Sequence, residues 1–89
     1  MKAIVTVVGK DQVGIIAAVC VHLASYNINV LDISQTVMQG YFTMMMVVDV
    51  SASNIPVAQL AQQLEEKGRE MNLSIRLQRE DIFEAMHRV

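Results

Sequence analysis

The sequence predicts an α+β fold whose elements follow one another in the order β-α-β-β-α-β. Two stretches of alternating apolar and polar residues, joined by the two-residue turn Gln39-Gly40, indicate a β-hairpin. Apolar residues at helical spacing on either side of this hairpin indicate two helices, and apolar runs of strand length begin and end the pattern. With 89 residues the chain forms one domain, over residues 1–79, followed by a tail at residues 80–89.

The first strand and first helix are predicted over residues 3–8 and 15–26. The first of these stretches is almost entirely apolar, which is typical of a central strand covered on both faces. We expect Asp11 or Gln12 to cap the helix at its start and Asn27 to end it in the left-handed conformation.

The hairpin strands are predicted over residues 30–38 and 41–50, and the second helix begins at Pro56 after Ser53 and Asn54 as possible caps. Residues 73–79 alternate as a half-exposed edge strand. In the second hairpin strand, one face is expected to carry Phe42, Met44, Met46, Val48 and Val50.

This order of elements is the ferredoxin-like, split βαβ arrangement. Right-handed crossovers then place both helices on one face of a four-stranded antiparallel sheet with strand order 4-1-3-2. The other face is left open and displays Met45 and Val47. The tail can form a short C-terminal helix with Ile82, Phe83 and Met86 on one side.

Composition restricts the possible partners. Hydrophobic residues make up 53% of the chain and charged residues 18%, which is more apolar surface than a lone small domain easily buries, so we expect self-association. A net charge of -2 without long runs of either sign argues against a nucleic-acid or anionic-membrane partner. No transmembrane helix is expected, and a single cysteine fits a reducing cytoplasm.

The loop between the first strand and first helix is the candidate ligand site. Two glycines permit close backbone approach to a ligand, a carboxylate and an amide lie between them, and a helix begins directly afterwards. The residues concerned are Gly9, Lys10, Asp11, Gln12, Val13, Gly14 and Ile15. Alternatively, Asp11 only caps the helix or closes the turn.

The outer face of the first helix carries no charge. Ala17, Val21, Ala24 and Ser25 stand where a solvated helix usually shows Glu, Lys or Arg, so this face is expected to meet another surface. The alternative is that small residues simply tolerate exposure.

Other chemistry finds little support in the sequence. Cys20 and His22 lie on nearly opposite sides of a helix, and three consecutive methionines at Met44 to Met46 alternate between strand faces, so we expect no metal and no cofactor. No nucleophile and base stand at a recognisable spacing, which argues against an enzyme. RNA-recognition domains share the topology, but residues 3–8 lack the aromatic side chains on which those domains stack bases.

Three stretches resemble the ACT domain family. They are Val-Gly-Lys-Asp-Gln-Val-Gly-Ile at residues 8–15, Tyr-Asn-Ile-Asn-Val-Leu-Asp-Ile at residues 26–33, and the hairpin Asp-Ile-Ser-Gln-Thr-Val-Met-Gln-Gly-Tyr-Phe-Thr-Met at residues 32–44. The chain is similar to small stand-alone prokaryotic ACT proteins and to the N-terminal ACT modules of formyltetrahydrofolate deformylase and the glycine cleavage system repressor. The motifs cover most of residues 3–79.

This resemblance implies pairing of two copies along the second strand and first helix, with an amino acid or other small ligand bound at the interface. The pocket positions match Asp11, Gly14 and Asn29. Asp11 stands where amino-acid binders often have asparagine, and Val13 replaces a frequent proline; a carboxylate repels a ligand carboxylate and attracts an ammonium group. The expected interface residues are Val21, Leu31, Ile33, Met45 and Val47.

Two hypotheses of function follow. The main one is a cytoplasmic, non-catalytic regulatory domain that binds a small molecule, most simply an amino acid, as a homodimer or tetramer. The alternative is an interaction module that docks on another protein through the open sheet face and binds no metabolite.

Overall fold

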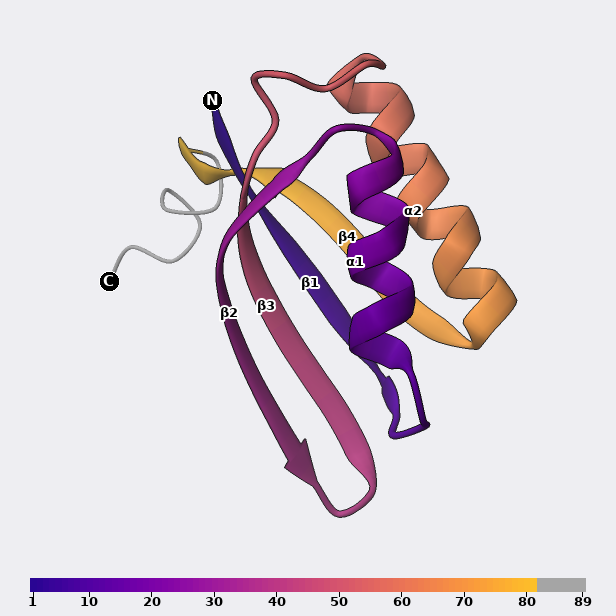
Figure 1. Cartoon of the computed structure of the whole chain (residues 1–89). Helices are drawn as coiled ribbons and strands as arrows, with labels where there is room; N and C mark the ends of the chain where they lie inside the picture. The colour runs from indigo at the N-terminus through magenta and orange to yellow at the C-terminus, as the bar shows by residue number, and fades with distance from the viewer. Residues whose placement is uncertain (82–89) are drawn as a thin grey trace.

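The chain alternates strands and helices in the predicted order in a computed structural model that describes residues 1–81 (Figure 1). The elements are β1 (Lys2–Lys10), α1 (Ile15–Ser25), β2 (Asn29–Met38), β3 (Tyr41–Asp49), α2 (Val57–Met71) and β4 (Leu73–Arg79). All six predicted elements are confirmed. The predicted C-terminal helix falls mostly on residues 82–89, which lie outside the described residues.

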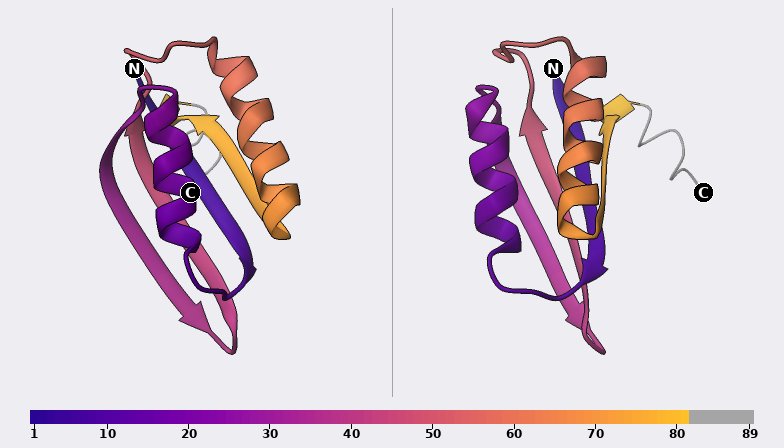
Figure 2. Two further views of the ribbon diagram at one scale, coloured as in Figure 1. Left: turned by 45° about the vertical axis from the view of Figure 1, so that its right-hand side comes forward. Right: turned by 90° about the vertical axis from the view of Figure 1, so that its right-hand side faces the viewer.

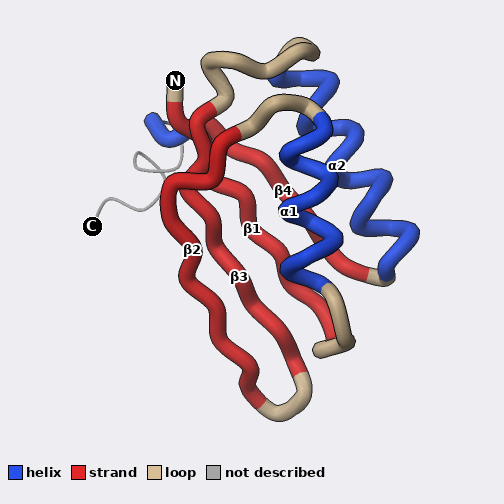
Figure 3. The backbone as a smooth tube through the Cα atoms, in the orientation of Figure 1, coloured by secondary structure: helices blue, strands red, loops and turns tan. Residues whose placement is uncertain are grey.

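The four strands form one antiparallel sheet in the order β2-β3-β1-β4, as predicted. Both helices lie on one face of this sheet (Figures 2 and 3). β1 and β3 are central, and β2 and β4 are the edges. Because β1 and β2 each run antiparallel to β3, they point in the same direction, and Lys10 and Met38 lie at the same end of the sheet.

The core lies between the sheet and the helices. Alternate residues of β3 point into it and are buried, as the sequence pattern predicts, and Val5 and Val7 do the same from β1. The helices contribute Val19, Leu23, Leu60 and Leu64. Burying a side chain of this kind stabilises the fold by roughly 1.5–3 kcal/mol.

No helix or strand within residues 1–81 covers the second face of the sheet, so the predicted open face is confirmed. The interpretation of the first strand as covered on both faces is wrong for Val8, although Ile4 on the same face is buried. Val8 is 42% exposed on this face and Met45 is 39% exposed. The reason is topological: both crossover helices pack on the same face, and the apolar run of β1 alone does not reveal this. No helix within residues 1–81 has the length and apolar character needed to span a membrane.

The turns follow the sequence closely, but the helix caps do not. Gln39 and Gly40 both have positive φ, 51° and 81°, as a tight hairpin turn requires, and Asn27 ends α1 with φ 62°. No side chain caps either helix, so the caps predicted for α1 and α2 are wrong. The amide of Gln12 bonds to Met71 instead, and the Ser53 hydroxyl donates to the Ile55 carbonyl within its own loop.

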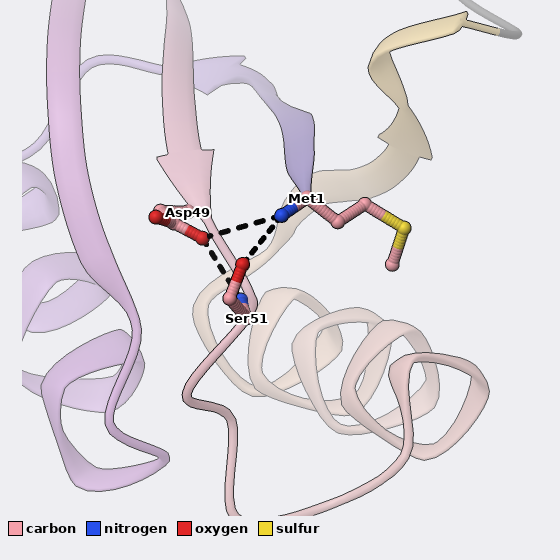
Figure 4. Close-up of polar contacts among 3 residues, drawn as sticks. All are labelled: Met1, Asp49 and Ser51. Carbon is pink, nitrogen blue, oxygen red and sulfur yellow. Dashed lines mark hydrogen bonds and ion pairs between the residues drawn. The ribbon is translucent and has the colours of Figure 1, made fainter.

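The end of β3 is tied to the start of β1 (Figure 4). The Ser51 backbone N–H donates to Asp49 Oδ1 at 2.9 Å, and the Met1 ammonium group lies 3.6 Å from the same oxygen and donates to the Ser51 hydroxyl. Hydrogen bonds from the Ser51 side chain and backbone, aided by the Met1 charge, lower the pKa of the Asp49 carboxyl below its ordinary value.

Candidate functional site

A cleft of about 250 Å³ opens between the loop after β1 and the β2–β3 hairpin. Its lining comes from the loop, the first turn of α1 and the hairpin strands: Asp11, Gln12, Gly14, Ile15, Ile16, Ala17, Gln35, Val37 and Phe42. Ligand pockets for drug-sized molecules measure about 300–1,000 Å³, so this cleft suits a smaller metabolite.

The loop is held at both sides by hydrogen bonds. The Asp11 N–H donates to the carbonyl oxygen of Gly40 at 2.8 Å, which attaches the loop to the hairpin turn. The Gln12 amide donates to the carbonyl oxygen of Met71 at 2.9 Å, which attaches it to the end of α2. These two bonds hold the Asp11 backbone and the Gln12 side chain, and both residues line the cleft.

The two glycines of the loop have different roles. Gly14 is the N-cap residue of α1 with φ 86°, a conformation that side chains other than glycine rarely adopt. At Gly9, an added Cβ would lie 2.5 Å from Leu73 Cδ2 and 3.3 Å from the Asn72 carbonyl oxygen. Gly9 therefore packs closely against the start of β4, where a larger residue would displace the Leu73 side chain, and it does not line the cleft.

The first turn of α1 faces the cleft without a cap. No side chain bonds to its N-terminal N–H groups, and no acidic residue lies in the first turn. These groups carry the positive end of the helix dipole. Backbone N–H groups of this kind bind carboxylates and phosphates well.

Asp11 is the one charged residue that lines the cleft within the described part of the chain. Gln12 and Gln35 add amide groups, and Ile16, Val37 and Phe42 add apolar surface. The cleft thus places one negative side chain beside the positive end of a helix, with an apolar wall between strand and helix.

The structure brings some of the predicted site residues together and separates others. Asp11, Gln12, Gly14 and Ile15 line the cleft. The remaining predicted residues do not line it: Gly9, Lys10, Val13 and Asn29. Asn29 begins β2 opposite Asp49, at the far end of the sheet from the cleft, because the full length of α1 lies between it and the loop.

Three cleft residues on the hairpin were missed by the sequence analysis: Gln35, Val37 and Phe42. Their contribution depends on the alignment of β1 with β3, which sets Lys10 opposite Tyr41 and thereby brings the loop to the hairpin. The sequence contained a signal for this contact: pairing the end of the first strand with the strand that follows the Gln39-Gly40 turn brings the first loop beside the hairpin.

The five residues predicted at an interface fall on two surfaces. Val21, Leu31 and Ile33 lie on α1 and the edge strand β2, and they are exposed. Met45 and Val47 belong to the open face of the sheet, where Met45 is exposed and Val47 half-buried. Residues 1–81 contain no group of three metal-ligating side chains.

The comparisons agree with this architecture. A family model described as the ACT domain matches residues 2–78. The UPF0237 protein of Clostridium acetobutylicum is 54% identical over 89 residues, which is the full length of both chains. The solved ACT domain protein from Streptococcus pneumoniae is 47% identical, each chain covers 98% of the other, and the TM-score is 0.83.

A more distant structure shares the fold alone. Formyltetrahydrofolate deformylase from Pseudomonas syringae is 21% identical over 86% of this chain and 27% of that protein, with a TM-score of 0.78. The resemblance inferred from the first loop, the second strand and the hairpin is confirmed, and the chain belongs to the ACT domain family.

Proposed function

We propose that this protein is a non-catalytic sensor that binds a small zwitterion, in the first instance an amino acid, in the cleft beside the first loop. ACT domains are commonly ligand-binding regulatory domains, which supports the general role. The specific proposal rests on one observation: the Asp11 carboxylate and the uncapped start of α1 line the same cleft.

The two ends of an amino acid match these two groups. The ligand carboxylate accepts hydrogen bonds from the free N–H groups of the first turn of α1, where the helix dipole favours negative charge. The ligand ammonium group pairs with Asp11, the one charged side chain of the lining. The apolar wall formed by Ile16, Val37 and Phe42 then contacts the ligand side chain.

A second copy of the chain completes the site in this proposal. β2 is an edge strand, so two copies can pair through it in antiparallel fashion and continue the sheet. Such pairing sets the start of β2 in one copy beside its end in the other. Asn29 of the second copy then lies next to the cleft formed by Gln35 and Val37 of the first.

Exposed apolar residues support the same pairing. Val21 of α1 is 70% exposed, and Leu31, Ile33 and Val37 of β2 are exposed as well. An antiparallel pair of β2 strands buries these residues between the two copies. Self-association through this surface also accounts for the large apolar share of the composition.

The test is a thermal-shift and calorimetry screen of the free amino acids. For the amino acid with the largest shift, two analogues are compared, one lacking the carboxylate and one lacking the amine, and both are expected to bind at least about tenfold more weakly. Asp11→Asn keeps the side-chain shape, removes the charge and is expected to cause a similar loss. Asn29→Ala tests the contribution of the second copy.

Glu66→Gln is the matched control, because it removes an exposed carboxylate on α2 outside the cleft. Binding is expected to be unchanged in this variant. The proposal fails if no amino acid shifts the melting temperature, or if Asp11→Asn binds as tightly as the native chain.

A further inference from the structure

A second cleft, of about 170 Å³, lies between α2 and β4. Its lining consists of Glu65, Arg69, Leu73, Ser74, Ile75 and Arg76. Four of these are consecutive residues of β4, and consecutive strand residues point to alternate faces. A cleft that contacts all four runs along the outer edge of the strand, and β4 is an edge of the sheet.

The walls of this cleft are fixed by a close backbone contact. At Gly68 an added Cβ would lie 2.6 Å from the Leu73 carbonyl oxygen and 3.2 Å from the Ile75 backbone nitrogen. α2 therefore packs directly against the β4 backbone, and Figure 2 shows the two elements side by side. A cleft between elements in such contact is organised before a ligand arrives, which lowers the entropy cost of binding.

The two arginines of the cleft have no ion-pair partner within residues 1–81. Other cations nearby do: Lys67 lies 3.8 Å from Glu70, and Arg79 lies 2.9 Å from Asp81. Arg69 and Arg76 share the cleft with Glu65, yet neither is within ion-pair distance of its carboxylate. The lining carries a net charge of +1, from two arginines and one glutamate, in a chain whose net charge is -2.

The edge of β4 adds backbone donors to these charges. In an antiparallel edge strand, every second residue points its N–H group away from the neighbouring strand. Part of residues 73–76 therefore presents free N–H groups along the cleft that Arg69 and Arg76 also line. Guanidinium groups bind planar carboxylates and phosphates with two parallel hydrogen bonds.

We propose that the α2–β4 cleft is a binding site for a small oxyanion, a carboxylate or phosphate group of a metabolite, held by Arg69 and Arg76. This site is separate from the first-loop cleft and shares no lining residue with it. Glu65 sets the strength of the site, because its carboxylate repels the bound anion. Removing this charge strengthens binding, whereas removing either arginine weakens it.

The test is a two-dimensional ¹H–¹⁵N NMR titration with sodium phosphate and, separately, sodium succinate, at constant ionic strength adjusted with sodium chloride. Saturable shifts are expected in the amides of Arg69 and residues 73–76. Arg76→Gln is expected to weaken binding by about tenfold or more, and Glu65→Gln to strengthen it severalfold. The anion that binds more tightly identifies phosphate or carboxylate as the recognised group.

Arg79→Gln is the control, because Arg79 lies on the same strand but is paired with Asp81 and does not line the cleft. It is expected to bind both anions as the native chain does. If Arg76→Gln gives a poorly dispersed spectrum, Arg69→Gln replaces it. The proposal is overturned if the shifts do not saturate, or if Glu65→Gln and Arg79→Gln change binding in the same direction and to the same extent.

Discussion

The side-chain amide of Gln12 donates a 2.9 Å hydrogen bond to the carbonyl oxygen of Met71, 59 positions later in the chain. Met71 is the last residue of α2, and carbonyl groups at a helix end lack partners within the helix. The loop after β1 leads into α1, and through Gln12 it also provides a donor for an unpaired carbonyl group at the end of α2. One residue links the candidate ligand site to α2.

We predict that Gln12→Ala lowers the free energy of unfolding by about 1 kcal/mol, the net contribution of one such hydrogen bond. Urea denaturation measures the change. Gln62→Ala is the matched control, because Gln62 is exposed on α2 and alanine is the better helix former, so no loss of stability is expected there. Equal stability of both variants would show that the bond to Met71 contributes nothing.

Gly68→Ala is expected to destabilise the protein by about 1–3 kcal/mol, the usual cost of overpacking. The sign of the change in unfolding free energy is informative, because Gly→Ala in an unobstructed helix stabilises the protein by about 1 kcal/mol. The predicted loss arises because the new methyl group would lie 2.6 Å from the Leu73 carbonyl oxygen. Thermal unfolding measures it, and a raised melting temperature would contradict the close packing of α2 on β4.

The order of strands and helices could be predicted because each element carries its own local pattern. Residues 41–49 form an apolar-rich run of strand length, and Gln39-Gly40 specifies the turn before it. These signals depend on neighbours in sequence. The helix caps were predicted wrongly because Gly14 and Pro56 occupy the N-cap positions, and neither has a side-chain acceptor.

The candidate site could be predicted only in part. Asp11 and Gly14 belong to one continuous loop, which the sequence displays directly. Gln35 and Val37 join them through the alignment of strands, which is a long-range property. Asn29 lies at the other end of the sheet, so a single chain does not bring it to the cleft, and only the proposed pairing of two copies would do so.

The Ser51→Ala variant is predicted to raise the pKa of Asp49 towards its ordinary value, because the Ser51 hydroxyl provides the largest stabilisation of the ionised carboxyl. A ¹³C NMR titration of the side-chain carboxyl measures this change. Ser53→Ala is the control, because the Ser53 hydroxyl donates to the Ile55 carbonyl within the same loop and does not reach Asp49. Its Asp49 pKa should match that of the native chain.

Stability is expected to follow from this shift. Because the pKa of Asp49 is lower in the folded state, the ionised carboxyl stabilises the fold fully above the unfolded-state pKa of about 3.9. That contribution is lost as the pH falls through the folded-state value. Urea denaturation at pH values from 6 downwards measures this effect. The unfolding free energy of Ser51→Ala should fall less with decreasing pH than that of the native chain, and an identical pH dependence would contradict the prediction.

Ile33→Asp and Met45→Asp separate the two surfaces on which the chain could self-associate. The two side chains are almost equally exposed, 40% and 39%, and they lie on opposite faces of the sheet, because Ile33 pairs with the buried Met46 and Met45 with Ser34.

If copies pair through β2 and α1, Ile33→Asp buries an unpaired carboxylate in each copy, at a cost of several kcal/mol. Sedimentation should then show a monomer for Ile33→Asp and the native dimer for Met45→Asp. The reverse result would place the interface on the open sheet face, and a native chain that is monomeric at micromolar concentration would remove the second copy from the proposed ligand site.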